Sequence, residues 1–318
     1  MSHKYNCLFL IQLLIVGGLK SQVKWVLADS LFQPLPSSFH VYKTTDSLNG
    51  KPNIAYYACV DLKDKKLAFV TATGNGKRHT PIQYFEQNEQ PLLVMNTTFF
   101  EFVHNSNLNV VINKSKLLAY QQHSIAGRGK DTLTYRHPFG SAIGISKKRA
   151  ADIAWLYTDT ASAFAYASQT PVPFFKDSIA DPSPGTMLKK GSFKKWKMQT
   201  AVGGGPVLVQ NGEINITNNE ELKFAGKAIE DKHPRSAMGY TKDGKLIFLA
   251  VEGRFPGKAE GATLMQMAQM LQAIGCVEAL NLDGGGSSCL LINGKETITP
   301  SDKTGQRPVP AVIMVKEH

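Results

Sequence analysis

The chain has 318 residues, of which 42% are hydrophobic and 19% are charged, a composition typical of a globular protein. This composition excludes a disordered chain, a collagen-like repeat and a membrane protein with several spans. Lys and Arg outnumber Asp and Glu by 36 to 25, so the net charge is +11. A positive charge favours anionic partners but does not identify one.

An apolar stretch from Cys7 to about Leu19 follows a single lysine near the start of the chain. It is short for a membrane span, which needs about 20 residues, but has the length of the hydrophobic region of a secretory signal. Small residues before Ser21 and again at 26–28 offer two cleavage sites. We therefore predict a signal peptide over residues 1–28 and an exported protein, periplasmic or extracellular, with no membrane span after its removal. A buried N-terminal helix is the alternative interpretation.

Short runs rich in β-branched and aromatic residues predict strands in the first half of the chain. These runs cover residues 54–60, 66–72, 91–96, 108–113 and 141–146. Residues 80–88 predict a helix, because Thr80 is a suitable N-cap and Pro81 is favourable at the first helical position. Residues 156–198 contain "PVPFF" and "DPSPG", which interrupt regular structure, so we expect long loops with a short helix there.

The last 120 residues have the clearest pattern, with strands on both sides of a glycine turn within 199–212 and a hairpin over 235–253. A helix is predicted over 261–275, from apolar residues at helical spacing and a terminal glycine. The remaining predicted strands cover 276–282, 288–294 and 309–315. Strands outnumber helices, and the predicted class is α+β: a single large mixed β-sheet with hairpins and a few packed helices.

Three cysteines remain once Cys7 is removed with the signal: Cys59, Cys276 and Cys289. An odd number allows one disulfide at most. Cys276 and Cys289 flank a glycine run and would meet if their strands are neighbours, but no regular framework is present and buried thiols are favoured.

Several common functional motifs are absent from the sequence. It has no H-E-x-x-H zinc motif, no G-x-S-x-G nucleophile, no P-loop and no EF-hand. RNA- and DNA-binding signatures are also missing, so a nucleic-acid partner is not expected.

The segment "NLDGGGSS", residues 281–288, places Asp283 at the end of an apolar strand. Three glycines allow backbone N–H groups to approach an anion without interference from a Cβ atom, and two serines add hydroxyl donors. A tight turn capped by the Asp side chain is the alternative. A second glycine run at 203–205, together with Arg235 and Arg254 near other strand ends, favours a functional site.

Five segments in this order resemble the phosphodiester glycosidase family. They are "NTTFF" (96–100), "AVGGGPVLVQNG" (201–212), "HPRSAMGYTKDGKLIFLAVEGR" (233–254), "GATLMQMAQMLQAIGCVEALNLDGGGSS" (261–288) and "RPVPAVIMV" (307–315). The resemblance implies a catalytic domain over residues 91–318. Residues 29–90 carry no matched motif, and 29–318 are expected to form one structural unit.

The family's reaction cleaves the bond between a sugar anomeric carbon and a phosphate. The resemblance implies Asp283 and Glu252 as the catalytic carboxylates, in the roles of acid and base or nucleophile. The family usually has Asp where this chain has Glu252. The resemblance also implies that substrate and phosphate are bound by Asn96, Gly204, Gly205, Arg235, Arg254, Gly284, Gly285, Gly286, Ser287 and Arg307.

The predicted partner is a sugar phosphate or a glycan, in polysaccharide or cell-envelope metabolism. No cofactor is required by the sequence, and a bound calcium or magnesium ion stays open because no ligand spacing predicts it. The alternative function is a non-catalytic, exported carbohydrate- or sugar-phosphate-binding protein on the same scaffold. The retained Asp283 favours the enzyme.

Overall fold

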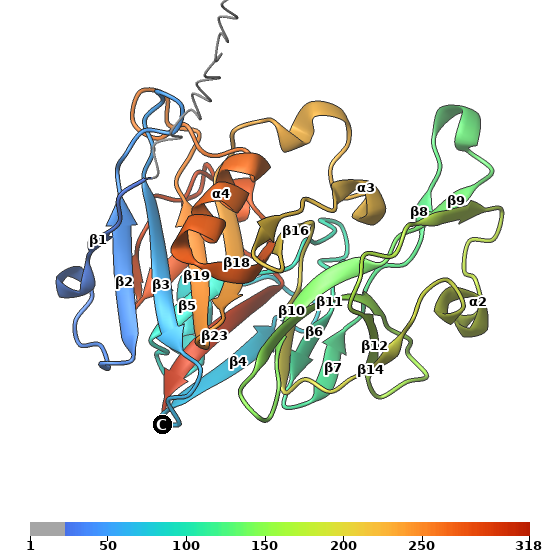
Figure 1. Ribbon diagram of the computed structural model, residues 1–318, viewed down its shortest axis with the longest axis horizontal. Coiled ribbons are helices and arrows are strands. Elements are labelled where there is room, and N and C mark those ends of the chain that lie inside the picture. The colour runs from blue at the N-terminus through green and yellow to red at the C-terminus, as the bar shows by residue number, and fades with distance from the viewer. Residues whose placement is uncertain (1–22) are drawn as a thin grey trace, which may run out of the picture.

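The computed structural model describes residues 23–318, which form four β-sheets and several short helices (Figure 1). Most of the predicted signal peptide, residues 1–22, lies outside the described part. Its last residues are folded: β1 (Val26–Leu27) pairs with β2 (Phe39–Thr44), and Ala28 is buried in the core. Cleavage after residue 28 would therefore remove a strand from the edge of a sheet.

The described strands are divided among four sheets, and their pairings are antiparallel. In spatial order, the eight-stranded sheet contains β1, β2, β3 (Ala55–Asp61), β19 (Lys245–Val251), β18 (Arg235–Thr241), β20 (Cys276–Asn281), β16 (Val207–Gln210) and β17 (Glu213–Ile214). The seven-stranded sheet contains β14 (Lys194–Trp196), β12 (Ala165–Ser168), β11 (Ala151–Tyr157), β10 (Gly140–Ile145), β15 (Thr200–Gly203), β6 (Val111–Asn113) and β7 (Lys116–Ala119).

Two smaller sheets complete the architecture. The five-stranded sheet contains β22 (Lys295–Glu296), β21 (Leu290–Ile292), β5 (Leu93–Asn96), β23 (Ala311–Glu317) and β4 (Leu67–Thr73). The three-stranded sheet contains β13 (Phe175–Asp177), β9 (Tyr135–His137) and β8 (Ile125–Ala126). The α+β class is confirmed, whereas the single large mixed sheet is wrong, because the chain repeatedly leaves one sheet for another.

One hydrophobic core joins the three larger sheets. Phe39 and Phe248 come from the eight-stranded sheet, Trp155 from the seven-stranded sheet, and Met95 and Ile313 from the five-stranded sheet. Each of these side chains is almost completely buried, so the inner faces of the sheets are closely packed against one another.

Two predicted helices are confirmed with their caps. In α1 (Pro81–Gln87) the Thr80 hydroxyl accepts from the Gln83 N–H, and in α4 (Leu264–Ile274) the Thr263 hydroxyl accepts from Gln266 in the same way. Gly275 ends α4 in the left-handed conformation at φ +98°. The buried side of α4 packs against β16 and β20 of the eight-stranded sheet (Figure 1).

The region predicted as long loops, 156–198, contains the short helix α2 (Pro184–Leu188) but also three short strands. β12 is hydrogen-bonded by β11 on one side and β14 on the other. The prolines lie in the connections between these strands. Their pairing comes from residues distant in sequence, which is why local composition did not show it.

The two glycine runs mark points at which the chain crosses between sheets. Residues 203–206 lead from β15 in the seven-stranded sheet to β16 in the eight-stranded sheet, and residues 283–288 lead from β20 to β21 in the five-stranded sheet. The ends of three sheets therefore meet around these two turns.

Glu221, at the end of the short helix α3 (Asn218–Glu221), ties these sheets together from inside. Its carboxylate is 1% exposed and accepts hydrogen bonds from the Ser141 N–H and hydroxyl, the Trp155 indole, the Val207 N–H and the Thr217 hydroxyl. A buried carboxylate is stable only where donors replace its water, and here five donors from both larger sheets and the loop before α3 do so.

Glu221→Ala is expected to lower the free energy of unfolding by at least about 3 kcal/mol, because it leaves several buried donors without an acceptor. Urea denaturation of the variant and of Glu220→Ala, a neighbour on the same helix, measures the difference. Equal small losses in both variants would show that the Glu221 network does not hold the sheets together.

Candidate active site

The strand register brings the predicted site residues to one end of the sheets. Arg235 begins β18 and pairs with Val251 of β19, directly before Glu252. Asn281 ends β20 opposite Ala237, only two residues before Asp283. In an antiparallel sheet, the beginning of one strand lies beside the end of its neighbour. These polar residues therefore lie at the same end of the sheet.

The backbone of Asp283 is held by the end of β5. Its N–H donates to the Thr97 carbonyl at 2.8 Å, and its carbonyl accepts from Asn96 Nδ2 at 2.6 Å. Asn96 Oδ1 accepts from the Ser236 hydroxyl at 2.8 Å and the Cys289 N–H at 3.1 Å. Asn96 is fully buried and both ends of its side-chain amide are used in these contacts, which are those of a residue that positions Asp283.

The glycines after Asp283 make room for two arginines. Gly285 has φ +62°, and a Cβ atom there would lie 2.9 Å from Arg254 Nη2. A Cβ atom on Gly286 would collide with Arg307 Nη2. Arg254 itself has φ +67°, an uncommon conformation for a residue with a side chain, and is exposed. The sequence predicted that these glycines let backbone N–H groups approach an anion. In the structure, the lack of side chains at Gly285 and Gly286 also lets the guanidinium groups of Arg254 and Arg307 lie against the turn.

Asp283 is half-buried among these groups. Burial raises the pKa of Asp283 to about 7, while hydrogen bonds from Ser287 and the Gly284 N–H and the positive charge of Arg307 act in the opposite direction. A carboxyl group with this pKa exchanges a proton near neutral pH, as acid–base catalysis requires.

Arg307 lies close to the turn and is held by a carboxylate. Its Nε donates to Asp302 Oδ2 at 2.7 Å, and its Nη1 lies 3.4 Å from the buried Ser287 hydroxyl. Asp302 thus fixes the direction of the guanidinium and neutralises part of its charge.

Arg235 is different, because its guanidinium is buried against backbone carbonyls. Nε donates to the Ala262 carbonyl at 3.0 Å and Nη2 to the Asp231 carbonyl at 2.8 Å, and the residue is 3% exposed. Burial and, to a smaller extent, the charge of Arg254 lower the pKa of Arg235 to about 10, while the charge of Asp231 acts in the opposite direction. A buried cation of this kind is a strong attractor for an anion.

Glu252 is occupied by contacts with two loops. It is 3% exposed, its Oε2 accepts from the Thr299 N–H at 2.8 Å, and its Oε1 lies 3.1 Å from Lys258 Nζ. Within residues 23–318, no hydrogen bond or ion pair joins Glu252 to Asp283. The structure brings both carboxylates to one edge but gives Glu252 the contacts of a positioning residue.

The second glycine run is also structural. The N–H groups of Gly203, Gly204 and Gly205 donate to the carbonyls of Val110, Ser141 and Asn281 at 2.7–3.0 Å. The backbone N–H groups of Gly204 and Gly205, predicted as phosphate-binding donors, are already used: the Gly204 N–H donates to Ser141 of β10 and the Gly205 N–H to Asn281 of β20.

The sequence prediction missed an aromatic and cationic corner beside this turn. Phe99 and Phe224 meet edge to face with centroids 6.0 Å apart. Arg235 lies 5.6 Å from the Phe224 ring, and Lys223 Nζ lies 5.5 Å from the Phe99 ring. Phe99 was visible in the "NTTFF" segment, but nothing in the sequence connected it with a loop more than 120 positions away.

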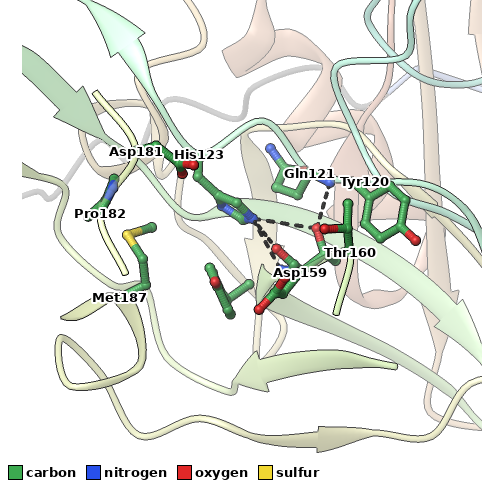
Figure 2. Close-up of a pocket in the computed structure, with 10 residues that line it drawn as sticks. Tyr120, Gln121, His123, Asp159, Thr160, Asp181, Pro182 and Met187 are labelled. Atoms are coloured by element: carbon green, nitrogen blue, oxygen red, sulfur yellow. Dashed lines mark hydrogen bonds between the residues drawn. The ribbon is translucent and has the colours of Figure 1, made fainter. Parts of the chain in front are cut away.

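A separate cavity of about 260 Å³ lies at the ends of β7 and β11 (Figure 2). Its lining includes Tyr120, His123, Asp159 and Asp181. Burial lowers the pKa of His123 to about 4, so this ring is neutral at neutral pH and the two aspartates make the cavity acidic. Its charge is the wrong sign for a phosphodiester, which favours the Asp283 edge as the reaction site.

No cluster of three or more His, Cys, Asp or Glu side chains in residues 23–318 is arranged to hold a metal ion. Within the same range, Cys59, Cys276 and Cys289 are free thiols, Cys276 and Cys289 buried and Cys59 half-buried, as favoured from the sequence. None of the helices in this part of the chain has the length and hydrophobicity of a membrane crossing.

The same fold is found in solved structures of low sequence identity. The catalytic domain of zebrafish N-acetylglucosamine-1-phosphodiester α-N-acetylglucosaminidase superposes with a TM-score of 0.58 at 20% identity, covering 93% of this chain and 89% of that one. A hypothetical protein from Synechocystis gives a TM-score of 0.59 at 16% identity, covering 90% of this chain and 64% of that one.

The fold is therefore the one that these solved structures share. A family model described as phosphodiester glycosidase matches residues 89–316, and the chain belongs to this family. The mouse enzyme N-acetylglucosamine-1-phosphodiester α-N-acetylglucosaminidase is 31% identical over 103 residues, 30% of this chain and 20% of that enzyme. The chain thus spans about a fifth of the length of the curated relatives that carry this name.

Asp283→Asn is expected to be more stable than the wild type at pH 8 and equally stable near pH 4. A carboxyl whose pKa is raised from 3.8 to about 7 on folding makes the wild type lose stability as pH rises between these values, by up to about 1.4 kcal/mol per pH unit. Urea denaturation from pH 4 to 8 measures this slope, with the exposed Asp181→Asn as the matched control. If stability depends on pH in the same way in Asp283→Asn as in the wild type, the pKa of Asp283 is not raised on folding.

Proposed function

We propose that this protein is an exported hydrolase that cleaves the glycosyl–phosphate bond of a sugar-1-phosphodiester. The observation that carries the proposal is Asp283, a carboxyl with a pKa near 7, beside three arginines that contact its turn or line its edge. Family membership and the names of its relatives support the same reaction class. A polysaccharide or another cell-envelope glycan is the proposed source of the substrate.

In the proposed reaction the bond between the anomeric carbon and the phosphate oxygen breaks. Water supplies the new hydroxyl on the sugar, and the phosphate departs as a monoester with the remaining group. Such a leaving group is already stable as an anion at neutral pH, so cationic side chains assist it better than a proton donor does. Arg235, Arg254 and Arg307 take this role.

Asp283 then acts in its ionised form, as the base that activates water or as the nucleophile. Glu252 holds the loops at Lys258 and Thr299 around it. Asn96 and Ser287 position Asp283 and Arg307. Dialysis against a chelator before the assay tests whether the reaction requires calcium or magnesium.

Purified protein is expected to release free sugar from a sugar-1-phosphodiester such as UDP-GlcNAc, and Asp283→Asn to lower kcat by at least about 100-fold. Sugar release is measured across several sugar-1-phosphodiesters. Binding without release by the wild type across this panel would favour the carbohydrate-binding alternative, and equal release by both proteins would remove Asp283 from the mechanism.

The pH dependence of kcat/KM distinguishes the roles of Asp283. If it acts as a carboxylate, kcat/KM rises with pH through about 7 and then levels off, because the ionised fraction increases over this interval. A fall through the same interval would instead make Asp283 the proton donor.

The N-terminus of the exported protein is expected near Ser21, the first of the two predicted cleavage sites, and not at residue 29. Trp25 packs edge to face on Tyr57 at 4.7 Å, and β1 pairs with β2, so these residues belong to the folded unit. Mass spectrometry of the secreted protein measures the cleavage position, and an N-terminus at residue 29 would contradict this expectation.

A further inference from the structure

Lys223 is a cation at the edge of the site that has no assigned role. It is half-buried, and the ion pairs within residues 23–318 involve other lysines and arginines. Glu221 is the nearest carboxylate in sequence, but both of its oxygens accept hydrogen bonds from donors on other elements. Burial lowers the pKa of Lys223, and the nearby charge of Glu221 acts in the opposite direction without a direct ion pair between them.

The local fold holds Lys223 in a defined place. Leu222 ends α3 in the left-handed conformation at φ +52°, which turns the chain toward the sheet edge beside β16 (Figure 1). Asn218 then fixes the next residue from both sides, accepting from the Phe224 N–H at 2.9 Å and donating to its carbonyl at 2.8 Å. A loop secured in this way can present a charged group without a large loss of entropy on binding.

Gly205 provides the space that the Glu221 carboxylate and the Lys223 side chain share. A Cβ atom on Gly205 would collide with Glu221 Oε2 and would lie 2.7 Å from Lys223 Cε, and φ is +117° at this glycine. Gly205 also exchanges two hydrogen bonds with Asn281, at 2.7 Å from its N–H and 2.8 Å to its carbonyl. Lys223 therefore packs directly on the turn that supports the strand leading to Asp283.

A second path of contacts leads from Lys223 to the same carboxylate. The Lys223 ammonium lies 5.5 Å from the Phe99 ring. Two residues before Phe99 is Thr97, whose carbonyl accepts a hydrogen bond from the Asp283 N–H. Phe224, next to Lys223 in sequence, lies under the Arg235 guanidinium. Lys223 and Arg235 thus lie against the same aromatic pair, Phe99 and Phe224.

We propose that Lys223 binds the phosphate group of the substrate and gives the site its preference for phosphodiesters over uncharged glycosides. The inference rests on the proposed function and names a residue that neither the sequence motifs nor the family resemblance assigned. A lysine ammonium is a compact charge on a flexible stem, suited to a phosphate whose position varies with the group attached to it. The alternative is a packing role, in which only the aliphatic stem against Gly205 matters.

Lys223→Met separates these two roles, because methionine keeps an unbranched apolar side chain and removes the charge. Lys223→Arg keeps the charge, and Lys227→Met removes an exposed lysine from the same segment as a matched control. Each protein is titrated with inorganic phosphate and separately with free N-acetylglucosamine by calorimetry, and kcat/KM is measured on a sugar-1-phosphodiester. Thermal unfolding of each variant reports whether the fold is retained.

Lys223→Met is expected to weaken phosphate binding by about 10-fold or more, the loss of one charge-assisted hydrogen bond, and to lower kcat/KM on the phosphodiester by a similar factor. Sugar binding stays within about 2-fold of the wild type, and Lys223→Arg retains most of the phosphate affinity. Phosphate affinity in Lys223→Met equal to that of Lys227→Met, or an equal loss for phosphate and sugar, would overturn the proposal. Wild-type protein that binds phosphate through Lys223 but releases no sugar would overturn the hydrolase function alone.

Discussion

The hydrogen bonds of one buried side-chain amide, that of Asn96, determine where Asp283 lies. Asn96 ends β5 in the five-stranded sheet, accepts from Ser236 in the eight-stranded sheet, and donates to the carbonyl of Asp283 at the crossing between them. With no solvent to replace these bonds, any movement of one sheet against the other costs at least one buried hydrogen bond. The position of Asp283 is therefore fixed by the packing of the sheets and is not left to a flexible loop.

The cations around Asp283 differ in how they are held. Arg307 is paired with Asp302, whereas Arg235 is buried against two backbone carbonyls and Lys223 is packed on Gly205. Asp231 and Glu221 act on Arg235 and Lys223 only without direct ion pairs, and a buried cation without such a pair costs stability. The pKa of Asp283 is raised because the cost of burying its charge outweighs the favourable hydrogen bonds and the charge of Arg307.

Much of the fold followed from local pattern. The Thr80 and Thr263 caps, the Gly275 terminus and the hairpin at 235–253 are set by residues close in sequence, and each is present where the pattern placed it. The number of sheets did not follow, because strand pairing in 156–198 and the crossings at the glycine runs depend on partners far along the chain. A period-two pattern shows that a strand has two faces but not which strand lies beside it.

For the site, the sequence by itself determined the family and the candidate groups: an aspartate after a buried strand, a glycine turn and arginines at other strand ends. Only the tertiary structure decided which of these groups are free to act. In the folded protein, the amides of Gly204 and Gly205 and the side chains of Asn96 and Glu252 make internal hydrogen bonds. Lys223, which the sequence did not single out, lies beside Gly205 and Phe99. The reason is physical: a polar group buried at a crossing of sheets must find a partner there, and that partner is chosen by packing across the fold.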